Sequence, residues 1–595
     1  MRFLSPSVLS LHLLPHRGGV SQDVFEHHDE ETPSDLPFTA LEDLHYALET
    51  MQTRYFELWL GTWPESIDWT GAVMGTYISA ALNSLTRSLG YSLPATSPQS
   101  FEDLHIKAVA EKWRIENEIN RYFTHGIGYY FGENAFAIRM QAFDDMLWVV
   151  LGWLEAIKFV QVHAQTHYDW ENLGQETEER GSDRWYGEQF LPAFAHRARI
   201  FYDLAKHGWD TQLCGGGMLW NPHMLPYKNA ITNELYIAAS AGMYLYFPGD
   251  NISSPFSEPQ KPPPGAFDQV AVNLTLEEEE ELLVKILPYD RTFLRAAVEA
   301  YDWLKRSNMT NDQGLYVDGF HIKNYGVNDT IGTGECDERS EEVYTYNQGV
   351  LLSGLRALWE ATGNISYLTD GHQLVRNVIA ATGWRLYHEP HLPPGWEGRW
   401  KWYGLGRAGV LEDSCDASGS CTQDSQTFKG IFFHHLTLFC EPLPDRAKMP
   451  GKTYGGSKET RMLHRQSCAE YAPWVVRNAR AAMRTRDERG RFGMWWAADV
   501  GADEGWNWRD VEPLSERVPK GVVGESEDTR HSMTHGTGTT WDGFPHRRAD
   551  PSLPAENESS DPNDRGRGRT VETQGGGVAV LRAMWELVIM YQKDS

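Results

Sequence analysis

The stretch from Ala142 to Val160, AFDDMLWVVLGWLEAIKFV, joins two adjacent carboxylates to a strongly apolar segment. The apolar residues that follow recur at helical spacing, so the stretch predicts a helix whose first turn carries Asp144 and Asp145. Neighbouring residues lie about 100° apart on a helix but on opposite faces of a strand. Only a helix start or a turn therefore lets both carboxyl groups lean into one cleft.

A carboxyl pair of this kind suits one class of chemistry. Retaining glycosidases need two carboxyl groups roughly 5 Å apart, one ionised and one protonated. The N–H groups and dipole of a helix start favour the ionised form of one aspartate, whose charge then raises the pKa of the other. The alternative is an N-cap aspartate with a solvated neighbour, which has the same sequence pattern.

Composition limits the partners that the chain can bind. The 54 Lys and Arg residues and 82 Asp and Glu residues give a formal charge of −28, which opposes binding to the phosphate backbone of nucleic acid. A neutral polymer fits better. The chain also has 23 Trp, 26 Tyr and 24 Phe residues, enough for a core and for rings that stack on sugars, although most aromatic side chains simply pack.

Cysteines and sequons indicate a secreted chain. The six cysteines form an even set that suits disulfides, and Cys415 and Cys421, which flank a short turn, are the best candidate pair. Asn-x-Ser/Thr sequons, which are acceptors for N-glycosylation, begin at Asn251, Asn273, Asn308, Asn328, Asn364 and Asn557.

The ends of the sequence carry weaker signals. Residues 1–37 are acidic near their end and are expected to be disordered; their first part resembles a degraded signal region without a clean cleavage site. No run of 18 apolar residues predicts a membrane span. The last residues, MYQKDS, lack the hydrophobic tail of a GPI-attachment signal.

Helical periodicity dominates the rest of the chain, and convincing period-two strands are scarce. The expected fold is a single all-α domain over residues 38–595, either an (α/α)6 barrel (toroid) or a superhelical array of helix pairs. No fixed-period repeat favours the array. Long insertions, expected to be surface excursions, interrupt it near 250–287, 442–467 and 499–570. The twelve predicted helices lie near 39–60, 68–89, 103–121, 144–163, 188–206, 229–247, 288–307, 347–362, 366–381, 426–440, 469–485 and 573–592.

Polar and aromatic residues gather at several of these helix starts. CGGGMLWNPHMLPYKNAITNELY, from Cys214 to Tyr236, brings glycines together with amide and ammonium groups that can bind hydroxyls. Asn221, Lys228, Asn229 and Asn233 supply those groups. The alternative is a tightly turned loop that binds no ligand. YTYNQ at 344–348, DSQTF at 424–428 and TQG at 573–575 also precede or begin helices, and in a toroid such starts would face one cleft.

Four motifs occur in an order that resembles glycoside hydrolase family 76, the α-1,6-mannanases and related transglycosidases. They are FDDMLWVVLGWLEAI, CGGGMLWNP with YKNAITNELY, YTYNQGVLLSGLRALWEATGN, and CTQDSQTFKGIFF. The resemblance implies an (α/α)6 barrel and a retaining mechanism in which Asp144 is the nucleophile and Asp145 the acid/base. It also suggests further residues in or near the cleft, with Asp318 an additional candidate that could equally cap a turn. The suggested substrate-binding residues are Trp220, Tyr227, Asn229, Tyr346, Asn347 and Gln348.

The expected function is therefore a secreted hydrolase of α-1,6-mannosidic bonds in mannan. One alternative is a transglycosidase that acts on mannose-containing GPI glycans in fungal cell-wall assembly. Another is a non-catalytic mannan-binding protein on the same scaffold. No cofactor and no metal are expected, because His434 and His435 lie in an apolar helix and neither a zincin motif nor EF-hand spacing is present.

Overall fold

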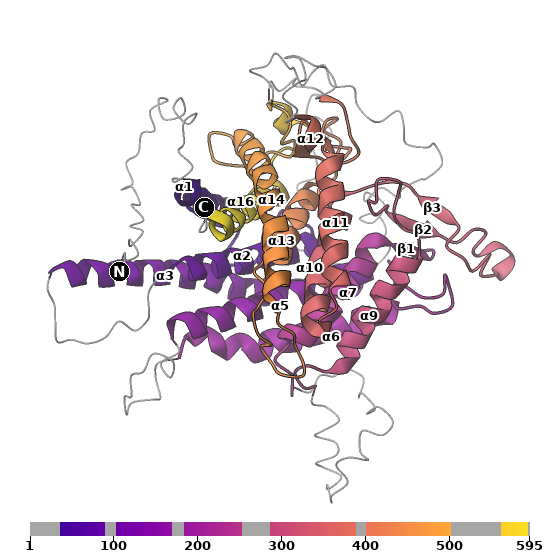
Figure 1. Cartoon of the computed structure of the whole chain (residues 1–595), viewed down its shortest axis with the longest axis horizontal. Helices are drawn as coiled ribbons and strands as arrows, with labels where there is room; N and C mark the ends of the chain where they lie inside the picture. The colour runs from indigo at the N-terminus through magenta and orange to yellow at the C-terminus, as the bar shows by residue number, and fades with distance from the viewer. Residues whose placement is uncertain are drawn as a thin grey trace, which may run out of the picture.

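The computed structural model is built mainly from helices (Figure 1). It describes residues 36–89, 103–168, 184–252, 286–387, 400–500 and 561–592. Most of the segment 1–37, which the sequence predicts to be disordered, and most of the insertions near 250–287 and 499–570 lie outside the described residues; the last two residues of the first segment belong to a helix.

Six helices form a closed inner ring. Each packs on the next in chain order, and the last packs back on the first. This closure excludes an open superhelical array and confirms the (α/α)6 toroid. The inner helices are α2 (Asp68–Ser88), α5 (Phe143–His167), α7 (Ala230–Tyr246), α10 (Thr345–Thr362), α13 (Phe428–Phe439) and α16 (Val571–Gln592).

Six further helices alternate with the inner ones along the chain and cover the outside of the ring. α3 packs on α2, α6 on α5, α9 on α7 and α11 on α10, while α1 and α14 both pack on α16. The order along the chain is therefore outer, inner, outer, inner throughout. The outer helices are α1 (Leu36–Arg54), α3 (Asp103–Gly132), α6 (Leu191–Ala205), α9 (Arg291–Arg306), α11 (Ser366–Ala381) and α14 (Lys458–Arg484).

Burial explains the two kinds of helix. In α7 every residue from Ala230 to Leu245 is buried, as expected for a helix enclosed on all sides. In α9 only one face is buried, and charged residues occupy the other. By length and composition α5 could cross a membrane, but 78% of its most apolar window is buried inside the structure, so its apolar residues belong to the core.

Three outer helices differ from their predicted bounds. α1 ends at Arg54 instead of near 60. α3 continues from the predicted end near 121 to Gly132, where the lack of a side chain permits close contact with the loop at Leu60, whose carbonyl oxygen would lie 2.3 Å from an added Cβ. α14 begins at Lys458 instead of near 469, so the end of the segment 442–467 is helical. Its first turns are mostly solvent-exposed and polar, which leaves no apolar stripe to predict them.

Short elements complete the described structure. β1 (Tyr227–Asn229), β2 (Gly319–His321) and β3 (Glu338–Ser340) form a small antiparallel sheet between α7 and α10. β4 (Gly406–Arg407) pairs with β5 (Val410–Leu411). The remaining short helices are α4 (Ala135–Arg139) and α12 (Trp384–Tyr387).

Three disulfides connect these elements. They join Cys214 to Cys336, Cys415 to Cys421, and Cys440 to Cys468. The pair predicted across the short turn at 415–421 is confirmed, and no cysteine is free.

Candidate functional site

The N-terminal ends of the six inner helices meet at one end of the ring. The indole N–H of Trp69 in α2 donates to Asp424 before α13, at 2.5 Å, and its ring stacks on Trp148 of α5. The Thr70 hydroxyl of α2 donates to Glu572 of α16 at 2.7 Å. These contacts place the starts of α2, α5, α13 and α16 side by side.

The starts of α5, α7 and α10 complete this end. The Phe143 N–H, at the start of α5, donates to the Trp220 carbonyl oxygen at 2.8 Å. The Ala230 N–H, at the start of α7, donates to the carbonyl oxygen of Asp318, whose own N–H donates to Glu342 ahead of α10. The Tyr346 ring of α10 stacks on Phe428 of α13 with 3.8 Å between ring centroids.

Asp144 and Asp145 both lie in the first turn of α5, as the sequence predicts. Asp144 is 8% exposed and Asp145 is 6% exposed. One Asp145 carboxylate oxygen accepts the Ala142 N–H at 3.1 Å, and one Asp144 oxygen accepts the Asp145 N–H at 3.1 Å. Backbone N–H groups therefore hold both carboxyl groups at the start of α5.

Trp220 and Tyr227 lie next to the start of α5. Both are partly exposed, and the Trp220 N–H donates to the Tyr227 carbonyl oxygen. The Tyr227 ring stacks on His321 with centroids 4.2 Å apart, and its hydroxyl donates to the Asp318 carboxylate. Burial raises the pKa of Asp318 to about 6, against the opposing effect of the Tyr227 hydrogen bond. Asp318 therefore titrates much closer to neutrality than an ordinary aspartate.

The predicted residues of the α10 motif lie at different depths. Tyr346 is partly exposed at the end of the ring, whereas Asn347 and Gln348 are fully buried. Gln348 accepts the Tyr316 N–H and donates to the Tyr316 carbonyl oxygen, both at 2.8 Å. It also donates to the Tyr344 carbonyl oxygen at 3.0 Å. Gln348 thus fixes the backbone beside the ring end.

The glycine-rich loop and the start of α7 bind mainly to each other. The buried Lys228 ammonium donates to backbone carbonyl oxygens of residues 210, 213, 216 and 217, and pairs with the Asp210 carboxylate at 3.0 Å. Asn229 accepts the Thr232 N–H as N-cap of α7. Asn233 exchanges hydrogen bonds with the Met218 backbone. For Lys228 and Asn233 the structure favours the alternative of an internally bonded loop.

Sequence reasoning missed two supporting residues of the ring end. Trp69 lies in the first turn of α2, and its aromatic position at a helix start was the available signal. Asp413 accepts the Thr345 N–H at 2.9 Å and the Thr345 hydroxyl at 2.8 Å, and so anchors the start of α10. Its distance along the chain from Thr345 leaves no local signal for this role.

Two clusters among the described residues have metal-ligand spacing, but the cysteines in both form disulfides. One consists of His372, His464 and Cys468. The other consists of Cys415, Asp416 and Cys421, and in it the Asp416 carboxylate is paired with Lys429 at 2.7 Å.

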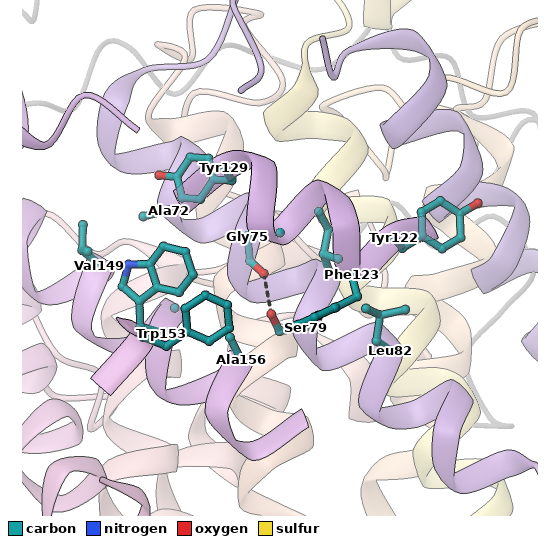
Figure 2. Close-up of a pocket in the computed structure, with 14 residues that line it drawn as sticks. Ala72, Gly75, Ser79, Leu82, Tyr122, Phe123, Tyr129, Val149, Trp153 and Ala156 are labelled. Carbon is teal, nitrogen blue, oxygen red and sulfur yellow. Dashed lines mark hydrogen bonds between the residues drawn. The ribbon is translucent and has the colours of Figure 1, made fainter. Parts of the chain in front are cut away.

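Two cavities lie away from the helix starts. Figure 2 shows an apolar one in the wall of the ring, lined by residues of α2, α3, α5 and α6 that include Ala72, Tyr129 and Trp153. The other is lined by charged and aromatic groups such as Glu155, Lys158, Arg356 and His435 from later turns of the inner helices. Neither is lined by Asp144 or Asp145.

The fold is a closed (α/α)6 toroid. Its candidate functional site is the end at which the inner helices begin, because the aspartate pair lies there in the first turn of α5. A model of glycosyl hydrolase family 76 matches residues 284–506, a segment that does not contain the aspartate pair. This match agrees with the family that the four ordered motifs of the sequence resemble.

Proteins of known name are similar to this chain. The mannan endo-1,6-alpha-mannosidase DFG5 of Saccharomyces cerevisiae is 22% identical over 255 residues, which cover 42% of this chain and 40% of that protein. A putative mannan endo-1,6-alpha-mannosidase of Schizosaccharomyces pombe is 21% identical over 249 residues, covering 41% and 40%. The chain thus spans about two fifths of the length of these curated relatives. The structure of the GH76A alpha-1,6-mannanase of a Salegentibacter species matches with a TM-score of 0.47 and 16% identity, covering 92% of this chain and 99% of that one.

Proposed function

We propose that this protein is a retaining glycoside hydrolase that cleaves α-1,6-mannosidic linkages in mannan. The observation that carries the proposal is the aspartate pair in the first turn of α5, at the end of the ring where all six inner helices begin. The match of residues 284–506 to the model of glycosyl hydrolase family 76 and the names of the curated relatives support the substrate class.

In the proposed mechanism an Asp144 carboxylate oxygen attacks the anomeric carbon of the mannosyl unit. The bond from that carbon to the glycosidic oxygen breaks, and Asp145 donates its proton to the leaving oxygen. Water then attacks the anomeric carbon of the covalent mannosyl-enzyme, Asp145 takes the proton of that water, and Asp144 leaves. Two displacements at one carbon retain its configuration.

Rings and amides near the pair are proposed to hold the substrate. Trp220, Tyr227 and Tyr346 offer partly exposed aromatic faces on which sugar rings can stack. Asn229, Asn347 and Gln348 are buried, and Asn229 and Gln348 accept the backbone N–H groups of Thr232 and Tyr316, so we assign them to the polar wall beneath the rings. We place the protein outside the cell or in the cell wall, consistent with its three disulfides.

Product analysis on debranched α-1,6-mannan tests the proposal. The parent protein should release short manno-oligosaccharides, and Asp144→Asn and Asp145→Asn should not. Products longer than the starting oligosaccharide would indicate that the protein is a transglycosidase, for example one that transfers to GPI glycans, and not a hydrolase. If the parent protein binds mannan without cleaving it, and Asp144→Asn binds mannan equally tightly, the protein is a non-catalytic mannan-binding protein.

A further inference from the structure

Three complete Asn-x-Ser/Thr sequons lie on the outer surface of one sector of the ring. They are Asn308-Met309-Thr310, Asn328-Asp329-Thr330 and Asn364-Ile365-Ser366, and all three asparagines are exposed. We propose that Asn308, Asn328 and Asn364 are modified by N-linked oligosaccharides. This assignment does not depend on the proposed hydrolase activity.

The backbone at these positions leaves room for a sugar chain. Asn308 follows the last turn of α9 with φ 57°, and Asn328 lies between β2 and β3 with φ 54°. Left-handed backbone at asparagine is typical of a tight surface turn. Each side chain therefore leaves the protein at a turn, where an attached oligosaccharide displaces no packed group.

Asn364 lies in the turn between α10 and α11 and already makes one useful hydrogen bond. Its side-chain oxygen accepts the Ser366 N–H at 3.1 Å. The sugar would be attached to the amide nitrogen, so modification preserves this bond. The Ser366 hydroxyl, which the glycosylating enzyme requires, is also exposed.

The cysteines point independently to a compartment in which this modification occurs. All six are paired in disulfides, and disulfides persist in oxidising, secretory environments. Asparagine-linked glycosylation takes place on chains that enter the same pathway. The sequons at surface turns and the fully paired cysteines therefore both support passage of the chain through the secretory pathway.

The chemistry needs one co-reactant, a lipid-linked oligosaccharide diphosphate supplied by the secretory pathway. The amide nitrogen of each asparagine forms a bond to the anomeric carbon of the first N-acetylglucosamine unit. The bond from that carbon to the lipid diphosphate oxygen breaks, the diphosphate leaves with the electron pair, and the amide loses one proton.

The three positions lie at both ends of one sector of the ring. Asn308 and Asn328 belong to the segment between α9 and α10, which carries β2 and β3 beside the start of α7. Asn364 follows the opposite end of α10. Sugars at these positions would lie on the α9 to α11 sector of the ring.

Peptide mass spectrometry of the full chain, secreted from a eukaryotic host, tests the three sites. After enzymatic deglycosylation in heavy-oxygen water, each of the three asparagines should be converted to labelled aspartate. Labelling that also occurs without the deglycosylating enzyme would reflect spontaneous deamidation and would contradict the assignment. An unmodified asparagine in the secreted protein removes that position from the proposal.

Sequon variants provide matched controls. Thr310→Ala, Thr330→Ala and Ser366→Ala should each remove one oligosaccharide from the intact mass, whereas Thr310→Ser, Thr330→Ser and Ser366→Thr should retain it. These substitutions leave every asparagine in place, including the Asn364 hydrogen bond. If the alanine and hydroxyl-retaining variants have the same glycan mass as the parent, the assignment is wrong.

Discussion

The start of α5 and the loop that leads into α7 both contain polar side chains but differ in their chemistry and their bonding. At α5 two adjacent carboxylates occupy one helix start. In the loop, the Lys228 ammonium lies among four backbone carbonyl oxygens, and Asn233 binds the Met218 backbone. The comparison teaches that the polar groups of a glycine-rich motif can be used up by bonds within its own loop, whereas an adjacent acid pair at a helix start is the arrangement to which we assign catalysis.

The largest expected effect is on catalysis by the α5 pair. Asp144→Ala and Asp145→Ala should each lower activity on mannan by at least about 10²-fold, because the nucleophile or the proton transfer is lost. The two should differ on a mannoside with a dinitrophenyl leaving group, which needs no proton. Asp145→Ala should still release dinitrophenol from it, and Asp144→Ala should not.

External azide sharpens the assignment of roles. It should restore turnover of the dinitrophenyl mannoside by Asp144→Ala, with inverted configuration in the mannosyl azide product. If azide instead rescues Asp145→Ala with inverted configuration and does not rescue Asp144→Ala, then Asp145 is the nucleophile and Asp144 the acid/base.

The next effect in size is on stability at the loop. Lys228→Met should lower the free energy of unfolding by about 3–5 kcal/mol, because several backbone carbonyl oxygens lose their buried donor and the partly exposed Asp210 carboxylate loses its partner. Urea unfolding followed by circular dichroism measures this change. Lys206→Met removes a more exposed lysine that pairs with Asp203 and should cost less than about 1 kcal/mol. If the two variants lose the same free energy of unfolding, Lys228 stabilises the loop no more than a surface lysine does, and this prediction is wrong.

A smaller loss is expected at the start of α10. Gln348→Ala leaves the Tyr316 N–H and carbonyl oxygen without their side-chain partner, at a cost of about 1–3 kcal/mol. Tyr346→Phe keeps the ring that stacks on Phe428 and should change stability by much less. Thermal unfolding of both variants decides this, and a cost confined to Tyr346→Phe would show that the stabilising roles are reversed.

A pH dependence is also expected at Glu412, the neighbour of the Asp413 that anchors the start of α10. Burial raises the pKa of Glu412 from 4.5 to about 7, although Arg407 and Trp495 both donate hydrogen bonds to it. Between these two pH values the folded protein binds more protons than the unfolded chain, so its free energy of unfolding falls as pH rises. Urea unfolding at about pH 5 and pH 7.5 should show a shallower fall for Glu412→Gln. A steeper fall in the variant would contradict the raised pKa.

Sequence periodicity predicted the helical fold well, because inner helices are apolar over most of their length. It failed at the start of α14, where Ser457 caps a helix whose first turns are largely exposed. The turn at 415–421 indicated one disulfide, whereas Cys214 and Cys336, 122 positions apart, are brought together only by tertiary packing.

The candidate site was predictable to a similar extent. The positions of Asp144 and Asp145 follow from a local pattern, since a helix start is encoded by its neighbouring residues. The bonding of Gln348 and Lys228 was not predictable, because their partners are backbone groups that carry no residue-specific signal. Their hydrogen bonds depend on how the chain returns to the ring end.

The configuration of the first-formed product tests the central claim most directly. Proton NMR of α-1,6-mannotetraose digestion, recorded before mutarotation, follows the anomeric proton of the newly formed reducing end. The proposed double displacement at Asp144 predicts that the α configuration appears first. Initial formation of the β configuration would mean a single displacement by water, and would contradict the role of Asp144 as nucleophile.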